Sequence, residues 1–207
     1  LPGVNVKTGP DDFYPIEREQ LMKFDGKQWT PPIDVTPAGL DVWRPTVAVE
    51  GNGAIWGIWS QAVNGNWDLH ARSYDTKTNR WSNDQRVTSE PGADIHSVAT
   101  TTRSGAVWVA WQSWENGDFA IKAQRLGGSG KSTPFTRDFP RGNEWQPSIA
   151  ADSKGKVYVA FDTYAKGNYD VYIWALDENA SNASGEIIPV ATSARFEARP
   201  TMAVDGQ

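Results

Sequence analysis

Short runs of alternating apolar and polar residues, each bounded by turn residues, recur along most of this chain. Three segments of the same pattern align without a gap, and they begin at Pro45, Ser97 and Pro147. Their turn glycines, Gly53, Gly105 and Gly155, are 52 and 50 residues apart. A fourth copy opens with RPTMAVDG at residues 199–206. A repeat of this length indicates that one structural unit is used several times.

The pattern within each unit predicts four strands. In the first copy, TVAV (46–49) and AIWGIW (54–59) are rich in β-branched and aromatic residues, and a glycine-containing turn separates them. WDLHARSY (67–74) alternates as a strand with one buried face does, and a weaker strand surrounds QRVT (85–88). No segment keeps a helical period between capping signals, so we expect little helix.

Four strands repeated in tandem every 50 residues or so are typical of the blades of a β-propeller. A two-sheet sandwich would lack this self-similarity, and a parallel β-helix would repeat at a shorter period. We therefore predict an all-β, incomplete propeller. Its parts are an N-terminal arm (1–20), a partial blade (21–40), three whole blades (41–92, 93–143 and 144–196) and the start of another (197–207). We expect it to be part of a larger propeller or to pair its open ends with another chain.

The repeat explains why the chain has 11 tryptophans. Large aromatic rings recur at three positions of the repeat: Trp56, Trp108 and Tyr158; Trp59, Trp111 and Phe161; Trp67, Phe119 and Tyr169. We expect these rings to fill the space between adjacent blades, with stacking on sugars as the alternative. Trp114 stands where the other copies have Ala62 and Tyr164, so the repeat does not require it and we expect it to be exposed.

Composition and charge narrow the class of protein. The net charge is −5 and no Lys/Arg-rich run is present, which argues against a nucleic-acid partner. With no cysteine, the chain cannot form disulfides or thiolate metal sites. No apolar run approaches the ~20 residues that cross a bilayer. The chain begins at Leu1 without a signal-like segment. We therefore expect a processed or excised chain, extracellular or periplasmic.

Three phrases, PSIAADSKGKVYVAF (147–161), GNYDVY (167–172) and RPTMAVDG (199–206), resemble the repeats of bacterial propellers in the TolB-like and BNR-like group. The resemblance covers residues from about 21 to the end and implies the propeller architecture. It implies no single activity, because such propellers serve many functions. Sialidase members carry an Asp-box in which one residue separates Asp from Gly, whereas two residues separate Asp152 from Gly155 here. Sialidase chemistry is therefore not carried over.

The repeat also locates a candidate site. In a propeller the first strand of each blade lines a central channel, and polar residues begin that strand in all four copies. These four, named the mouth residues, are Arg44, His96, Gln146 and Arg199. Acidic residues precede three of them, namely Asp94, Glu144 and Glu197. Trp114 and Asp118, around the turn between the second and third strands, are expected on the same face.

We consider two roles for the mouth residues. They form a pocket for a polar or anionic ligand, with Arg44 and Arg199 as fork-shaped anion donors. Alternatively, their side chains bond to neighbouring blades and loop backbone. The two histidines, His70 and His96, occupy different repeat positions, so we expect no zinc site, and we expect His70 to face solvent. Asp/Asn turns could bind calcium, but turn chemistry explains them equally well, and no cofactor is expected.

Three functions fit these observations. The first, which we expect, is a non-enzymatic binding or scaffold module of an exported bacterial protein, with a protein, polar or carbohydrate ligand on the channel-mouth face. The second is the propeller portion of a glycan-acting hydrolase or lyase, whose catalytic residues lie elsewhere or among the mouth residues. The third is a structural subunit that assembles head to tail through its open blade edges.

Overall fold

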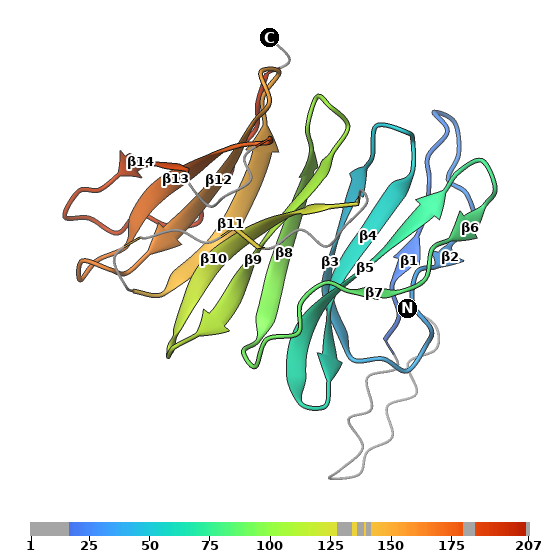
Figure 1. Ribbon diagram of the computed structural model, residues 1–207, viewed down its shortest axis with the longest axis horizontal. Helices are drawn as coiled ribbons and strands as arrows, with labels where there is room; N and C mark the ends of the chain where they lie inside the picture. The colour runs from blue at the N-terminus through green and yellow to red at the C-terminus, as the bar shows by residue number, and fades with distance from the viewer. Residues whose placement is uncertain (1–16, 128–133, 136–138, 140–141, 180–184, 206–207) are drawn as a thin grey trace.

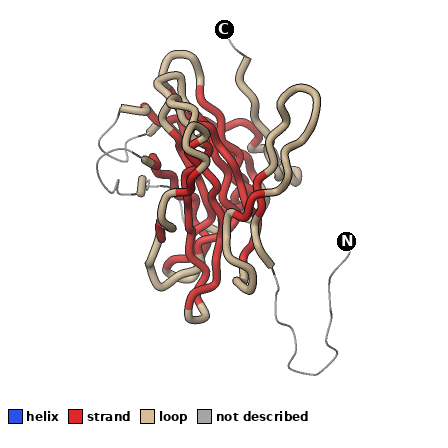
Figure 2. The backbone as a smooth tube through the Cα atoms, turned by 90° about the vertical axis from the view of Figure 1, so that its right-hand side faces the viewer, coloured by secondary structure: helices blue, strands red, loops and turns tan. Residues whose placement is uncertain are grey.

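The computed structural model describes residues 17–127, 134–135, 139, 142–179 and 185–205 (Figure 1). These residues form strands and turns and contain no helix, and Figure 2 shows the strands gathered in one stack with turns at its two ends. None of the described residues forms a helix that could span a membrane. Residues 1–16 of the predicted arm and 206–207 of the last predicted unit lie outside the described part of the chain.

The strands pair antiparallel into four sheets. The N-terminal pair contains β1 (Gln20–Leu21) and β2 (Ile33–Asp34). The first large sheet contains β3 (Val42–Val49), β4 (Ile55–Val63), β5 (Asn66–Asp75), β6 (Arg80–Trp81) and β7 (Gln85–Arg86). The second contains β8 (Asp94–Thr101), β9 (Val107–Glu115) and β10 (Asp118–Leu126). The third contains β11 (Glu144–Ala151), β12 (Lys156–Thr163), β13 (Asp170–Asp177) and β14 (Glu186–Ala191).

Tight turns join the first three strands of each large sheet, so these strands pair in chain order. In the first sheet β6 and β7 both pair with β5. The β4–β5 and β9–β10 hairpins turn at Asn64-Gly65 and Asn116-Gly117, and all four residues have positive φ angles of 53°, 83°, 54° and 93°. Asn and Gly adopt this backbone most readily, and such turns match the twist of paired strands. The three large sheets lie side by side across Figure 1. Their first strands are neighbours, since β8 contacts both β3 and β11.

The core lies between successive sheets, as the repeat predicts. Trp56 and Trp111 belong to the cluster between the first and second sheets. Trp108 and Phe161 belong to the cluster between the second and third. Trp59 packs on Val35 and Val42, between the first sheet and the N-terminal pair. The position that holds Trp67, Phe119 and Tyr169 differs from the prediction, because these rings are only half-buried.

The fourth strand of each unit varies more than predicted. It is a full strand, β14, in the third sheet and two short pieces, β6 and β7, in the first. In the second sheet the described residues keep only one bridge at this position, from Ala123 to Phe135. Residues 192–205 form no strand, although the Met202 N–H donates to Ser148 Oγ of β11 at 3.0 Å. This last segment therefore lies beside the first strand of the third sheet.

Candidate functional site

The four mouth residues share an unusual backbone conformation. Arg44, His96, Gln146 and Arg199 have φ angles of 47°, 59°, 52° and 59°. The other described non-glycine residues with positive φ are the turn residues Asn64, Asn79 and Asn116. In all three large sheets the pairing of the first strand with the second shifts at the mouth residue, between Trp43 and Thr46 and at the equivalent points of β8 and β11. Each of these three mouth residues therefore sits in a β-bulge.

A bulge of this kind costs stability and redirects the chain. A left-handed conformation costs an L-residue roughly 1–2 kcal/mol, and bulges re-aim side chains near functional sites. Proline follows three of the mouth residues, at Pro45, Pro147 and Pro200. Proline suits this position because a bulge leaves an N–H without a ladder partner and proline has none. The same strain kept in four copies points to a shared use of this backbone.

His96 is held between two neighbours. Its imidazole stacks on Trp43, with ring centres 5.2 Å apart and an interplanar angle of 17°. Its Nδ1 lies 2.5 Å from Gln112 Oε1, which also accepts a hydrogen bond from the Gln146 N–H at 3.1 Å. Gln112 Oε1 is an amide oxygen and accepts hydrogen bonds, so His96 must be the donor in this contact. The Nδ1 atom of His96 therefore carries the proton. Burial lowers the pKa of His96, which keeps the ring neutral at pH 7.

The sequence did not single out Gln112, which joins two mouth residues from one position. The equivalent residue of the third sheet, Asp162, holds the backbone of the next mouth residue, since its Oδ2 accepts from the Arg199 N–H at 2.8 Å. Both side chains are buried. The latch between sheets thus uses the backbone of the mouth residue more than its side chain. A signal was present, because each residue is polar and follows a repeat aromatic in an otherwise apolar strand.

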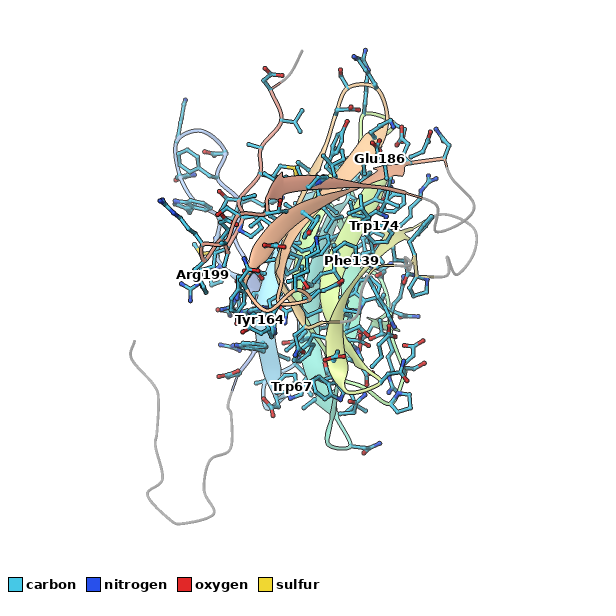
Figure 3. The ribbon with its side chains drawn as sticks, turned by 90° about the vertical axis from the view of Figure 1, so that its left-hand side faces the viewer. Trp67, Phe139, Tyr164, Trp174, Glu186 and Arg199 are labelled. Carbon is cyan, nitrogen blue, oxygen red and sulfur yellow. The ribbon has the colours of Figure 1, made fainter. Side chains whose placement is uncertain are left out.

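The side chains of the two mouth arginines, Arg44 and Arg199, are accessible to a ligand. Arg44 and Arg199 are exposed, and Figure 3 shows Arg199 at the edge of the molecule. The Arg44 guanidinium carbon lies 5.1 Å from the centre of the Trp43 ring, a cation–π arrangement. Ion pairs among the described residues involve other side chains, for example Arg86 with Asp68 at 2.6 Å. Neither mouth arginine is therefore committed to a described carboxylate.

The acidic residues that precede His96 and Gln146 stabilise the fold through hydrogen bonds. Asp94 and Glu144 are buried, with 1% and 5% exposure. Asp94 Oδ1 accepts from Trp111 Nε1 at 2.8 Å within the second sheet, and burial raises the pKa of its carboxyl group. Glu144 Oε2 accepts from the Ile121 N–H at 2.6 Å and so ties the third sheet to the second.

Glu197 and Asp118 lie nearer the surface and are both half-buried. The carboxylate of Glu197 accepts hydrogen bonds from the backbone and the hydroxyl of Ser193, so it orders the loop before the last mouth residue. Asp118 begins β10 and pairs in register with Glu115 across the hairpin. Three of the predicted acidic residues, Asp94, Glu144 and Glu197, therefore accept hydrogen bonds that stabilise the fold. Asp118 instead lies at a hairpin turn.

Aromatic pairs stand beside the mouth residues on every large sheet. Trp43 and Trp67 have ring centres 6.3 Å apart, Trp114 and Phe119 are 5.0 Å apart, and Tyr164 and Tyr169 are 5.1 Å apart. Trp145 and Phe196 extend the last pair, at 5.5 Å and 4.7 Å from Tyr169. Trp43, Trp114, Tyr164 and Phe196 are 40%, 42%, 47% and 73% exposed. Trp114 is therefore exposed, as predicted.

These rings and the mouth residues share one side of the molecule, named the mouth face. In each sheet the start of the first strand pairs with the end of the second, as Val42 does with Gln61. The second-to-third strand turns therefore emerge beside the mouth residues. Figure 3 shows Trp67, Tyr164 and Arg199 along the same edge of the stack.

The loop before each first strand supports the neighbouring turn. The Trp114 N–H donates to Ala93 O at 2.8 Å, and the Tyr164 N–H donates to Asn143 O at 3.1 Å. A Cβ added at Gly92 would lie 1.6 Å from the carbonyl oxygen of Trp114. Glycine at this position therefore allows the loop to touch the hairpin that carries Trp114.

The prediction that His70 faces solvent is wrong. His70 is 6% exposed, lies against Trp59 with ring centres 6.0 Å apart, and has Nδ1 3.0 Å from Asp84 Oδ2. It lies on the same face of the first sheet as Trp59, its partner in register on β4, and Trp59 belongs to the core cluster on that face. No cluster of three His, Asp or Glu side chains in the described part of the chain is placed to hold a metal ion.

The chain resembles solved structures in its fold. No family model matches the chain, and no curated protein matches it. Among solved structures, it is similar to the endo-arabinase from Bacteroides thetaiotaomicron VPI-5482, with a TM-score of 0.51 and 14% identity over 80% of this chain and 69% of that one. It is also similar to the Hadza microbial sialidase Hz136, with a TM-score of 0.55 and 16% identity over 80% of this chain.

An ulvan lyase of polysaccharide lyase family PL25 matches 82% of this chain with a TM-score of 0.54 and 11% identity. The chain spans 38% of the sialidase and 49% of the ulvan lyase. At these identities the likeness concerns the fold alone. The chain is thus an all-β protein of stacked antiparallel sheets whose structural neighbours have propeller-type folds.

Proposed function

We propose that the chain is a glycan-binding propeller module whose sheets are the blades and whose ligand lies on the mouth face. The observation that carries this proposal is an aromatic pair on each large sheet, with one exposed ring and one half-buried ring, beside the polar mouth residues. Aromatic faces pack against the apolar faces of sugar rings, while guanidinium, imidazole and amide groups suit sugar hydroxyls. Arg44 and Gln146 are such groups, and described residues leave the Arg44 side chain without an ion pair.

The names of the structural neighbours agree with this class of ligand. An endo-arabinase, a sialidase and a polysaccharide lyase are all proteins that act on glycans. Propellers of one architecture serve many functions, so these names support the class of ligand and assign no residue. A secreted or periplasmic location follows as part of the proposal, since polysaccharides of this kind are met outside the cell.

Binding is favoured over cleavage by the state of the acidic residues. Asp94 and Glu144 are buried and accept hydrogen bonds that hold the sheets, so they do not form a pair of free carboxylates for acid–base work. One observation favours cleavage as a second candidate. Burial raises the pKa of the Asp162 carboxyl group, whose Oδ1 has no described partner. Release of new reducing ends or unsaturated products from a bound polysaccharide would establish that candidate.

The test is a binding titration with soluble polysaccharides and three tryptophan variants. Trp43→Ala and Trp114→Ala each remove an exposed ring of the mouth face. Trp29→Ala is the matched control, because Trp29 is 61% exposed but pairs with Phe24 outside the mouth face. We expect the first two variants to weaken binding by about twofold to tenfold, since stacking on one aromatic ring is worth about 0.5–1.5 kcal/mol. Equal effects of all three variants would refute the proposed face.

Head-to-tail self-association remains a separate proposal. Val47 and Val49 of β3 are 56% and 53% exposed, which leaves an apolar edge beside the N-terminal pair. Sedimentation at several protein concentrations tests it, because a mass that stays constant at 22.8 kDa would refute association.

A further inference from the structure

Resting on the proposed glycan-binding function, we infer that the ligand is an extended acidic glycan. Its carboxylate or sulfate groups pair with Arg44 and Arg199 at the two ends of the row of mouth residues. Its sugar rings lie over the aromatic pairs of the successive sheets between them.

The order of charges along the row supports an acidic ligand. Arg44 stands on the first sheet and Arg199 follows the third, and both are exposed. Between them are His96, whose lowered pKa keeps it neutral at pH 7, and the amide Gln146. Guanidinium groups bind carboxylates and sulfates through two parallel hydrogen bonds. The row therefore offers cationic sites at its ends and neutral hydrogen-bonding groups in its middle.

The distribution of acidic side chains agrees with this pattern. Asp94 and Glu144 lie below the surface, where they are bound within the fold. Asp118 remains on the middle sheet, and its neighbour Glu115 pairs with Lys122 at 2.8 Å. A ligand anion is thus disfavoured at the middle sheet and favoured near the two arginines, since the carboxylates beside Arg199, those of Asp162 and Glu197, already accept hydrogen bonds within the fold. The chain as a whole carries a charge of −5, so attraction for an anion depends on these local groups.

The arrangement of the sheets supports a ligand of several sugars. Arg44 and Arg199 belong to different units of the repeat, and the path between them leads along β3, β8, β11 and the segment that ends at residue 205. His96 on the second sheet and Gln146 on the third stand between them. Each large sheet also carries an exposed aromatic side chain on this face. These side chains are Trp43, Trp114 and Tyr164 in chain order. One residue of sugar could not use both arginines and these rings.

The experiment compares ligand charge and length on the intact chain. Oligogalacturonates of two, four and eight units supply carboxylates, carrageenan oligosaccharides supply sulfates, and neutral galactan oligosaccharides of the same lengths are the controls. We expect affinity to rise at least tenfold from the two-unit to the eight-unit acidic ligand. We also expect neutral ligands of equal length to bind about tenfold more weakly, as one lost charged hydrogen-bond pair predicts.

Two sets of variants separate this inference from the proposed function. Arg44→Gln with Arg199→Gln should remove the preference, so that acidic ligands bind no more tightly than neutral ligands of the same length, while Trp43→Ala should weaken the binding of both. Arg44→Lys should restore only part of the preference, because lysine keeps the charge without the fork. Thermal unfolding confirms that each variant is folded.

The outcomes are distinct. Equal binding of neutral and acidic ligands, no dependence on length, or an unchanged preference in the double arginine variant would overturn the acidic, extended ligand while glycan binding stands. Absence of binding to any oligosaccharide would overturn both proposals. A preference for galacturonate or for the sulfated ligand alone would support the inference and identify the anionic group.

Discussion

At the scale of single residues, strain and burial are concentrated at the mouth. Four side chains that would be unremarkable in a loop occupy left-handed backbone at equivalent points, and two buried acceptors, Gln112 and Asp162, hold the neighbouring N–H groups. A residue that only filled space would not need this conformation. The strained backbone therefore accompanies the hydrogen bonds that the Gln146 and Arg199 N–H groups make to the preceding sheet, and the strain can be measured separately from binding.

Replacing Arg44 with glycine should separate strain from function. The backbone of Arg44 has a φ of 47°, a left-handed conformation that strains residues with a Cβ atom and does not strain glycine. Arg44→Gly should therefore be more stable than Arg44→Ala by about 1 kcal/mol, the reverse of the order found in ordinary strand positions. Urea unfolding of both variants measures the difference. Alanine equal to or above glycine would show that the backbone is not strained.

Asp162 predicts a dependence of stability on pH. Its carboxyl group ionises near 3.8 in the unfolded chain and at higher pH in the folded chain, because burial raises its pKa. Between these two values the folded state holds the extra proton, so stability falls as pH rises through the window. Asn keeps an acceptor for the Arg199 N–H without the charge.

Asp162→Asn should therefore gain stability relative to the wild type at pH 7, and the gain should shrink as pH falls toward 4. Asp162→Ala, which also removes the acceptor, should be less stable than Asp162→Asn by about 1–2 kcal/mol at each pH. Thermal unfolding at pH 4, 5.5 and 7 measures all three proteins. A gain for Asn that stays the same at every pH would contradict a raised pKa.

At the scale of elements, glycines set how closely loops and hairpins approach. Gly51 and Gly105 bring the first turns of two sheets together, with the Gly51 N–H donating to Gly105 O at 2.9 Å. Gly92 brings the loop before β8 against the hairpin of β9 and β10. The Gly92 contact recurs at Gly142, where an added Cβ would lie 2.5 Å from Ala165 Cα. The shape of the mouth face therefore depends on backbone contacts as much as on side chains.

Gly92→Ala should displace the Trp114 hairpin. The new Cβ would meet the Trp114 carbonyl oxygen at 1.6 Å, and backbone cannot yield without moving the hairpin. Gly57→Ala is the matched control, because its Cβ would meet only the end of the Val35 side chain at 3.2 Å. We expect a loss of about 1–3 kcal/mol and altered tryptophan fluorescence for Gly92→Ala, and a smaller loss for Gly57→Ala. The opposite order would contradict the close approach.

At the scale of the whole molecule, the sheets stabilise one another. The second sheet contributes to two core clusters, with Trp111 facing the first sheet and Trp108 facing the third. The N-terminal pair is attached by a smaller cluster, and a gap of about 250 Å³ remains between it and β3 and β4. Stability should therefore be greatest in the middle of the stack and lowest at its N-terminal end.

Trp111→Leu should destabilise the whole stack. Trp111 is fully buried, and loss of a large buried ring costs about 3 kcal/mol or more. Trp29→Leu should change stability by less than about 0.5 kcal/mol, since Trp29 is 61% exposed. Denaturant unfolding followed by fluorescence and circular dichroism measures both. Similar losses for the two variants would contradict the proposed distribution of the core.

The sequence by itself determined the repeated unit of the fold, and it led to the prediction of a candidate site at the mouth residues. The glycine and aromatic spacing predicted the strands, the interior positions of Trp56, Trp108 and Trp111, and the exposure of Trp114, because turn chemistry and burial are local and recur in each copy. It also selected the four mouth residues, although it contained no sign of their backbone conformation.

Only the tertiary structure decided how each side chain is used. It placed Asp94 and Glu144 inside the fold and turned His70 inward. It also brought Gln112 of β9 into contact with His96 of β8 and with Gln146 of the third sheet. These outcomes depend on which sheet covers which face and on contacts between residues distant in sequence. A repeat specifies equivalent positions, but the burial and hydrogen-bond partners of a side chain are properties of the packed stack.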